Sequence, residues 1–80
     1  MKYVDVLANR ILELCEEREI TINKLSTLSG INQSTLDNIV KRNTKSPGIR
    51  TLHRISIGFG LTVSQFLDIP ELNEKQLEDE

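Results

Sequence analysis

The sequence is poor in cysteine and in aromatic residues, and each scarcity excludes a class of protein. Cys15 is the single cysteine, so no disulfide can form within the chain. Tryptophan is absent and aromatic residues make up 4% of the 80 residues, which favours aliphatic helix packing over a β-sandwich. The longest apolar runs are two or three residues, so we expect no membrane-spanning segment. A chain of this length suits one small domain.

Other scarcities bear on location and chemistry. A lone cysteine, and the lack of a secretory apolar stretch in MKYVDVLANR, indicate a reducing, cytoplasmic location. His53 is the single histidine, which argues against a multi-histidine metal site. Neither a glycine-rich phosphate loop nor a catalytic pair of side chains is recognisable. We therefore expect no enzyme, no metal ion or other cofactor, no small-molecule ligand and no membrane contact.

The charges are distributed unevenly along the chain. The net charge of −2, taken alone, argues against a nucleic-acid ligand. Residues 24–54, however, carry six basic residues and one acidic residue, which gives +5, whereas residues 1–20 carry −2 and residues 71–80 carry −4. A basic segment between acidic ends produces a one-sided field that attracts an anionic partner. The alternative is that these basic residues only solvate one surface.

Apolar residues recur at steps of three and four, which predicts an all-α protein. We expect five helices, at roughly residues 4–18, 22–28, 33–41, between Gly48 and Gly60, and at 63–68. Gly58 lies inside the fourth helix and is expected to weaken its end, because glycine is a poor helix former.

A helix start signal occurs three times. In each copy a threonine or an asparagine follows one apolar residue and precedes another by four positions. The polar side chain can cap the helix by accepting a hydrogen bond from a free N–H, and the two apolar residues pack together across the start. The copies are Ile20-Thr21 with Leu25, Ile31-Asn32 with Leu36, and Leu61-Thr62 with Phe66.

The second and third helices are separated by Ser29-Gly30-Ile31, which is the pattern of a helix-turn-helix. Gly30 suits the left-handed conformation that ends a helix and turns the chain. In the third helix, at 100° per residue, the apolar residues define the buried side and leave Ser34, Asn38 and Lys41 on the opposite side. The apolar residues are Leu36, Ile39 and Val40.

In these features the chain resembles the lambda repressor and Cro family of DNA-binding domains, the XRE-type regulators. The resemblance covers about residues 7–68. It rests on Ile20-Thr21-x-x-x-Leu25-Ser26-x-x-Ser29-Gly30-Ile31-x-x-Ser34-x-Leu36-x-x-Ile39, then on Pro47-x-x-x-Thr51-Leu52-x-x-Ile55, and finally on Leu61-x-x-x-x-Phe66-Leu67.

The resemblance implies a compact five-helix domain whose third helix, residues 33–41, enters the major groove of DNA. We expect residues 1–69 to form this helix-turn-helix DNA-binding domain and residues 70–80 to form an acidic, loosely ordered C-terminal tail. The alternative is that Leu72 and Leu77 extend a helix into the tail. The expected function is that of a sequence-specific transcriptional regulator, a small repressor.

The resemblance and the helical spacing together nominate the DNA contacts. Amide and hydroxyl side chains near the start of such a helix can bond base edges, so the expected base-reading residues are Gln33, Ser34 and Asn38. Asn32 is expected to cap the helix. The alternative is that the three side chains are plain solvated surface. The expected phosphate contacts flank the helix and are Thr21, Lys41, Arg42, Asn43 and Lys45.

One recognition helix covers only a few base pairs, so we expect a homodimer on a double-stranded DNA operator. Its half-sites would lie about 34 Å apart, which is one turn of DNA. The candidate dimer surface is the fifth helix and the residues that follow it, namely Phe66, Leu67, Ile69 and Leu72. The alternative for Phe66 and Leu67 is an ordinary place in the core.

Two departures from the family pattern keep a second function open. Many relatives have a glutamine where this chain has Ile22, and a buried arginine–glutamate pair where it has Cys15 and Val40. An apolar pair avoids the desolvation cost of buried charge, so stability need not suffer, and we expect Cys15 to be a core residue. Ile22 and the net acidity favour the alternative of a protein-interaction module on the same fold, either an adaptor or an antitoxin.

Overall fold

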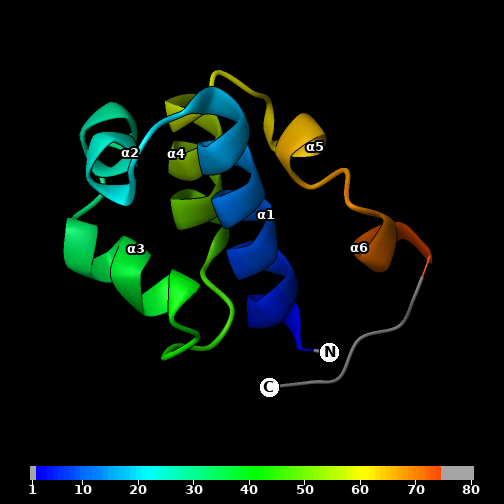
Figure 1. The fold of residues 1–80 in the computed structure, drawn as a ribbon. Coiled ribbons are helices and arrows are strands. Elements are labelled where there is room, and N and C mark those ends of the chain that lie inside the picture. The colour runs from blue at the N-terminus through cyan, green and yellow to red at the C-terminus, as the bar shows by residue number, and fades with distance from the viewer. Residues whose placement is uncertain (1, 75–80) are drawn as a thin grey trace.

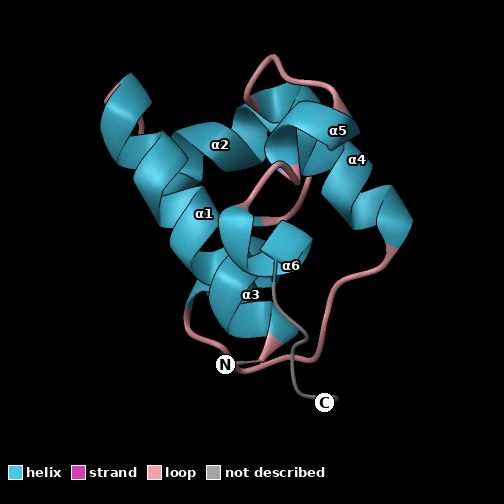
Figure 2. Ribbon diagram, turned by 90° about the vertical axis from the view of Figure 1, so that its right-hand side faces the viewer, coloured by secondary structure: helices cyan, strands magenta, loops and turns pink. Residues whose placement is uncertain are grey.

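The computed structural model describes residues 2–74, which fold into six helices and no strand (Figures 1 and 2). The helices are α1 (Tyr3–Arg18), α2 (Ile22–Ser29), α3 (Gln33–Val40), α4 (Ile49–Gly58), α5 (Val63–Phe66) and α6 (Pro70–Glu74). The prediction of an all-α fold is confirmed, and the first three helices begin and end within one residue of the expected positions. Figure 1 shows α2 and α3 on one side of α1 and α4, with α5 and α6 on the other side.

The first residues of the expected loose tail are helical. Pro70 suits the first turn of a helix, because the N–H that it lacks would have no partner within the helix. The N–H groups of Leu72 and Asn73 donate to the Ile69 carbonyl at 3.0 and 3.1 Å. The Asn73 side chain also donates to Asp68 Oδ1 at 2.9 Å. Residues 70–74 are therefore helical, which fits the alternative that Leu72 extends a helix, and residues 75–80, with Leu77, lie outside the described part of the chain.

The core joins α1 to α2, α3, α4 and α5. Its members are aliphatic apart from Phe59 and Phe66, whose rings stack with centroids 6.2 Å apart, and Cys15. Arg10 of α1 also binds the end of α5. Its Nε donates to the Phe66 carbonyl and its Nη2 donates to the Gln65 carbonyl, each at 3.0 Å. The buried core residues are Leu7, Ile11, Leu14, Cys15, Leu25, Leu36, Ile39, Ile55, Phe59 and Phe66.

Burial corrects two residues of the candidate dimer surface. Phe66 is 0% exposed and Ile69 is 5% exposed, so both side chains already pack within one copy of the chain. Burying a phenylalanine is worth about 1.5–3 kcal/mol, which explains why the short α5 turns Phe66 inward. Leu67 and Leu72 are only half-buried and keep part of their surface in solvent.

Cys15 and Val40 occupy apolar surroundings. Cys15 is buried in the core, and Val40 packs against the same cluster. Burial raises the pKa of the Cys15 thiol above its ordinary value, because a thiolate would lose hydration there. The thiol therefore stays protonated at neutral pH and reacts slowly.

Two of the three expected caps are present. Thr21 Oγ1 accepts a hydrogen bond from the Lys24 N–H at 3.0 Å. Thr62 and Gln65 exchange two bonds of 3.0 Å each, which is the reciprocal capping box. The prediction for Asn32 is wrong, because its side chain makes no capping bond although it stands at the N-cap position of α3.

Short linkers end the helices in a common way. One residue with positive φ follows each of the first four helices, and the N–H of the next residue donates to a carbonyl five positions back. This arrangement satisfies carbonyls that the helix end leaves open. The residues with positive φ are Glu19 (53°), Gly30 (72°), Arg42 (60°) and Gly60 (72°).

Gly58 has a packing role that the sequence did not reveal. A Cβ placed on Gly58 would lie 3.0 Å from Leu25 Cδ1 and 3.0 Å from Ser29 Cβ, both in α2. It would also lie 3.2 Å from the Ser29 backbone nitrogen, which cannot move without α2. The absence of a side chain at Gly58 therefore allows α2 and α4 to approach closely, and α4 extends through this residue.

We expect Gly58→Ala to destabilise the protein by up to about 2 kcal/mol. Overpacking costs about 1–3 kcal/mol, and the better helix propensity of alanine returns about 1 kcal/mol. Thermal or urea unfolding followed by circular dichroism measures the difference. A gain in stability is the usual result of replacing a helical glycine by alanine. Such a gain would show that α2 and α4 can accommodate a Cβ at Gly58 without cost.

Candidate nucleic-acid interface

The rotation of α3 is fixed by its two buried residues. Leu36 is 0% exposed and Ile39 is 1% exposed. Ser34 and Asn38 are exposed, as the spacing predicted, and Gln33 in the first turn is exposed as well. Hydroxyl and amide groups thus project from α3 into solvent, where a ligand can reach them.

Gln33 is held by Asn23, which was not among the predicted site residues. Asn23 Nδ2 in the first turn of α2 donates to Gln33 Oε1 at 2.6 Å. The bond links the starts of α2 and α3 and limits the rotamers of Gln33. It directs the Gln33 carbonyl oxygen to α2 and leaves the amide NH₂ as a donor for an acceptor on a ligand. The spacing of ten residues gave no local signal for this pair.

A groove runs along the other flank of α3. It consists of two adjoining cavities of about 300 and 240 Å³, which share Thr35 of α3 and Thr51 of α4. We name this feature the α3–α4 groove. Its lining residues are Gly30, Ile31, Asn32, Thr35, Asn38, Ile39, Thr44, Pro47, Arg50, Thr51 and Arg54.

Two arginines of α4 belong to the α3–α4 groove and were not nominated from the sequence. Arg50 and Arg54 are both exposed, and Arg54 Nη1 donates to the Gly30 carbonyl at 3.4 Å. They lie one helical turn apart, so they share one face of α4. The spacing of four residues between the two arginines is the sequence signal that could have identified the pair. The prediction used them only as part of the net charge of residues 24–54.

The nominated phosphate contacts have different surroundings. Lys41, Asn43 and Lys45 are exposed in the connection between α3 and α4, which is the longest loop among the described residues (Figure 2). The Thr21 hydroxyl accepts the capping bond of α2. Arg42 is turned toward α1, where its guanidinium bonds Asp5 and Asn9.

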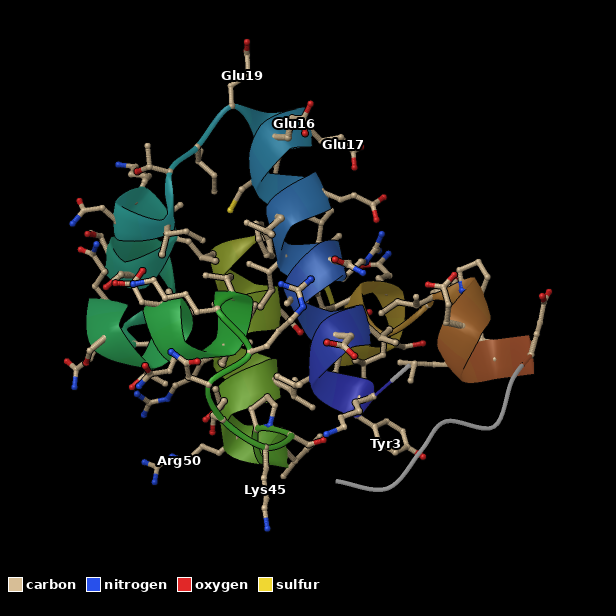
Figure 3. All side chains as sticks on the ribbon, turned by 60° about the horizontal axis from the view of Figure 1, so that its bottom comes forward. Tyr3, Glu16, Glu17, Glu19, Lys45 and Arg50 are labelled. Atoms are coloured by element: carbon tan, nitrogen blue, oxygen red, sulfur yellow. The ribbon has the colours of Figure 1, made fainter. Side chains whose placement is uncertain are left out.

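Basic and acidic side chains project from opposite ends of the molecule. Figure 3 shows Lys45 and Arg50 at one end, and Glu16, Glu17 and Glu19 at the other. The basic end adjoins the α3–α4 groove, which Arg50 lines. A ligand at the exposed side of α3 would therefore meet positive charge on the flank formed by α4.

Ile22 is the first residue of α2. Its side chain is half-buried and packs against the core, so it offers no polar contact at the start of α2. Within residues 2–74, no helix is both long and apolar enough to cross a membrane, and no three His, Cys, Asp or Glu side chains gather as a metal-binding group.

Comparisons with known proteins identify the fold and the family. Residues 10–71 match the family described as the Cro/C1-type HTH DNA-binding domain. Prophage Lp1 protein 11 has a crystal structure that superposes with a TM-score of 0.81 at 33% identity, over 92% of this chain and 99% of that one. No curated protein sequence matches the chain significantly.

Two further structures show the same fold at lower identity. SinR of Bacillus subtilis, a master regulator for biofilm formation solved in complex with DNA, superposes with a TM-score of 0.69 at 24% identity, over 78% of this chain and 98% of that one. The restriction-modification controller protein C.Esp1396I gives 0.71 at 19% identity, over 85% and 88%. The described residues form six helices where five were expected, and α2 and α3 form the helix-turn-helix. The chain belongs to the Cro/C1-type helix-turn-helix DNA-binding family.

Proposed function

We propose that the protein is a sequence-specific transcriptional regulator, a small repressor, that reads the major groove of a double-stranded DNA operator with α3. The observation that carries the proposal is the exposed row of Gln33, Ser34 and Asn38 on a helix whose other side is buried. Gln and Asn can bond adenine through two hydrogen bonds, and Ser can donate to or accept from several bases. The protein acts by binding, and a repressor of this kind blocks access to the DNA that it covers.

The flanks of α3 suit the two strands of the duplex. On one flank, Lys41, Asn43 and Lys45 extend into solvent from the loop after α3. On the other, the start of α2 presents backbone N–H groups beside Thr21. Phosphate contacts on both sides would set the register of α3 in the groove without reading sequence.

A protein-interaction module on the same fold, an adaptor or antitoxin, is the alternative. Ile22 favours it, because this half-buried apolar side chain offers a phosphate no polar contact at the start of α2. Salt dependence separates the two functions. Each phosphate contact contributes about −0.9 to the slope of log affinity against log salt, whereas an apolar protein interface has a shallow slope.

The operator-bound form is proposed to be a homodimer, because one α3 spans only a few base pairs. A cavity of about 230 Å³ with an almost wholly apolar lining opens between the start of α1 and α6, and Leu67 and Leu72 both line it. We propose a second copy of the chain as the occupant, since an isologous contact across a two-fold axis would cover the apolar lining of both copies at once.

We expect Gln33→Ala to weaken binding to the selected duplex by about 1–3 kcal/mol and to relax the preference at one base position. Lys45→Ala should weaken binding to every duplex about equally and reduce the salt slope by about 1. Selection from a random duplex pool, followed by titration at several salt concentrations, measures both effects. If no duplex is enriched at low salt, the adaptor function replaces the regulator.

We expect Asn23→Ala to lower affinity for the selected duplex by about 0.5–1.5 kcal/mol, because Gln33 loses the bond that limits its rotamers. Asn23 is exposed and its substitution removes no core contact, so the thermal midpoint should stay within the error of the wild type. In the Gln33→Ala background the same substitution should have little further effect. Additive losses in the double variant would show that Asn23 acts independently of Gln33.

We expect Leu72→Asp to raise the dimer dissociation constant about tenfold or more, because a carboxylate would enter an apolar contact. Sedimentation equilibrium without DNA measures this constant. Leu12→Asp is the matched control, since Leu12 is 43% exposed on α1 and does not line the cavity. Equal behaviour of the two variants would place the dimer contact elsewhere.

A further inference from the structure

At the carboxyl end of α3, one charged side chain reaches across to α1. Arg42 Nε donates to Asp5 Oδ1 at 3.1 Å, and Arg42 Nη2 donates to Asn9 Oδ1 at 2.6 Å. Asp5 and Asn9 lie four residues apart and share one face of α1. We name these three residues the Arg42 clasp. The clasp joins segments that are 33 and 37 positions apart in the chain.

The backbone of Arg42 adopts a conformation that an arginine seldom takes. Its φ is 60°, directly after the last turn of α3, and the Asn43 N–H donates to the Asn38 carbonyl at 2.8 Å. Glycine is the usual residue at this place in a helix ending, and the chain uses glycine after α2 and α4. An arginine here is disfavoured by its Cβ, and the contacts of its side chain with α1 help to offset that cost.

The apolar contact between α1 and α3 leaves a need for such a link. Cys15 of α1 and Val40 of α3 both pack in the same apolar core, Cys15 as a buried member and Val40 as a partly buried one. Apolar packing has no preferred direction, whereas a guanidinium that bonds two fixed oxygens sets both distance and angle. Arg42 supplies that directional link from the edge of the core.

We infer that Arg42 is a positioning residue for DNA readout. The Arg42 clasp fixes the carboxyl end of α3 against the first turns of α1, and thereby fixes the direction of Asn38 and Lys41. The inference rests on the proposed function, because readout by α3 is what the clasp serves. It assigns a part in recognition to Asp5 and Asn9, which lie on α1 and outside the helix-turn-helix.

A direct phosphate contact is the competing role for Arg42. Arg42 lines a surface cavity of about 400 Å³ together with Lys2, Thr44 and Lys45, and Asp5 lines it as well. A phosphate in this cavity would compete with Asp5 for the guanidinium. The two roles predict opposite effects when the Asp5 charge is removed. A released Arg42 would strengthen binding to every duplex, whereas a loosened α3 would weaken binding to the selected duplex alone.

The test compares the double variant Asp5→Asn/Asn9→Ala with the wild type on the selected duplex and on a scrambled duplex. We expect affinity for the selected duplex to fall about threefold to fivefold, which is the size of a half-exposed ion pair, while affinity for the scrambled duplex does not fall. Arg42→Lys should give the same selective loss, because lysine keeps the charge and loses the planar fork. Glu13→Gln is the control, since it also removes one negative charge from the exposed surface of α1 and should leave the ratio of affinities unchanged.

Thermal unfolding of each variant identifies a temperature at which all of them are folded, and DNA affinity is measured there. A loss of affinity then results from a changed orientation of α3 and not from unfolding. An unchanged ratio between the two duplexes, or a rise in affinity for both, overturns the inference while wild-type DNA binding still supports the proposed function. If the wild type enriches no duplex, both the inference and the proposed function are overturned.

Discussion

The burial of Leu36 and Ile39 is the constraint on which the whole interface depends. Both side chains are at most 1% exposed, so α3 cannot turn about its axis without opening the core. Because successive residues of a helix are 100° apart, this constraint turns Ser34 and Asn38 to the solvent side of α3 and places Gln33 and Thr35 on opposite flanks. The flank of Gln33 meets α2 at Asn23, and the flank of Thr35 meets α4 across the α3–α4 groove. The recognition surface is therefore a consequence of packing.

The linkers between helices help to keep the helices in these positions, because each linker ends one helix and leads directly into the next. A residue with positive φ closes one helix, the apolar residue after it packs against the core, and the next residue caps or begins the following helix. Ile20, Ile31 and Leu61 hold the middle position of such linkers and tie the chain to the core. The connection after α3 departs from the pattern, because Asn43 stands where the others have an apolar residue. Polar bonds from Arg42 to α1 take the place of apolar anchoring there.

The sequence predicted those features that depend on neighbours in the chain. Helix bounds, the caps at Thr21 and Thr62 and the outward face of α3 follow from spacings of one to four residues, and such spacings can be read directly. The bonds of Gln33 to Asn23 and of Arg42 to α1 could not be read, because they join residues 10 to 37 positions apart and depend on how helices cross. The burial of Phe66 and Ile69 likewise depends on where α5 lies against α1. Asn32 shows the converse, since a cap residue at a cap position directs its side chain elsewhere.

The acidic net charge does not oppose a nucleic-acid ligand once the charges are placed in space. The molecule is 32 Å long, and Glu16, Glu17 and Glu19 project from the end opposite Lys45 and Arg50 (Figure 3). At physiological ionic strength exposed charges are screened beyond about 8 Å, so a phosphate at the α3–α4 groove senses the basic residues near it and little of the distant acidic end. The local field, rather than the sum over the chain, sets the contribution of each side chain to binding. The separation also orients the molecule during approach, because a polyanion attracts one end and repels the other.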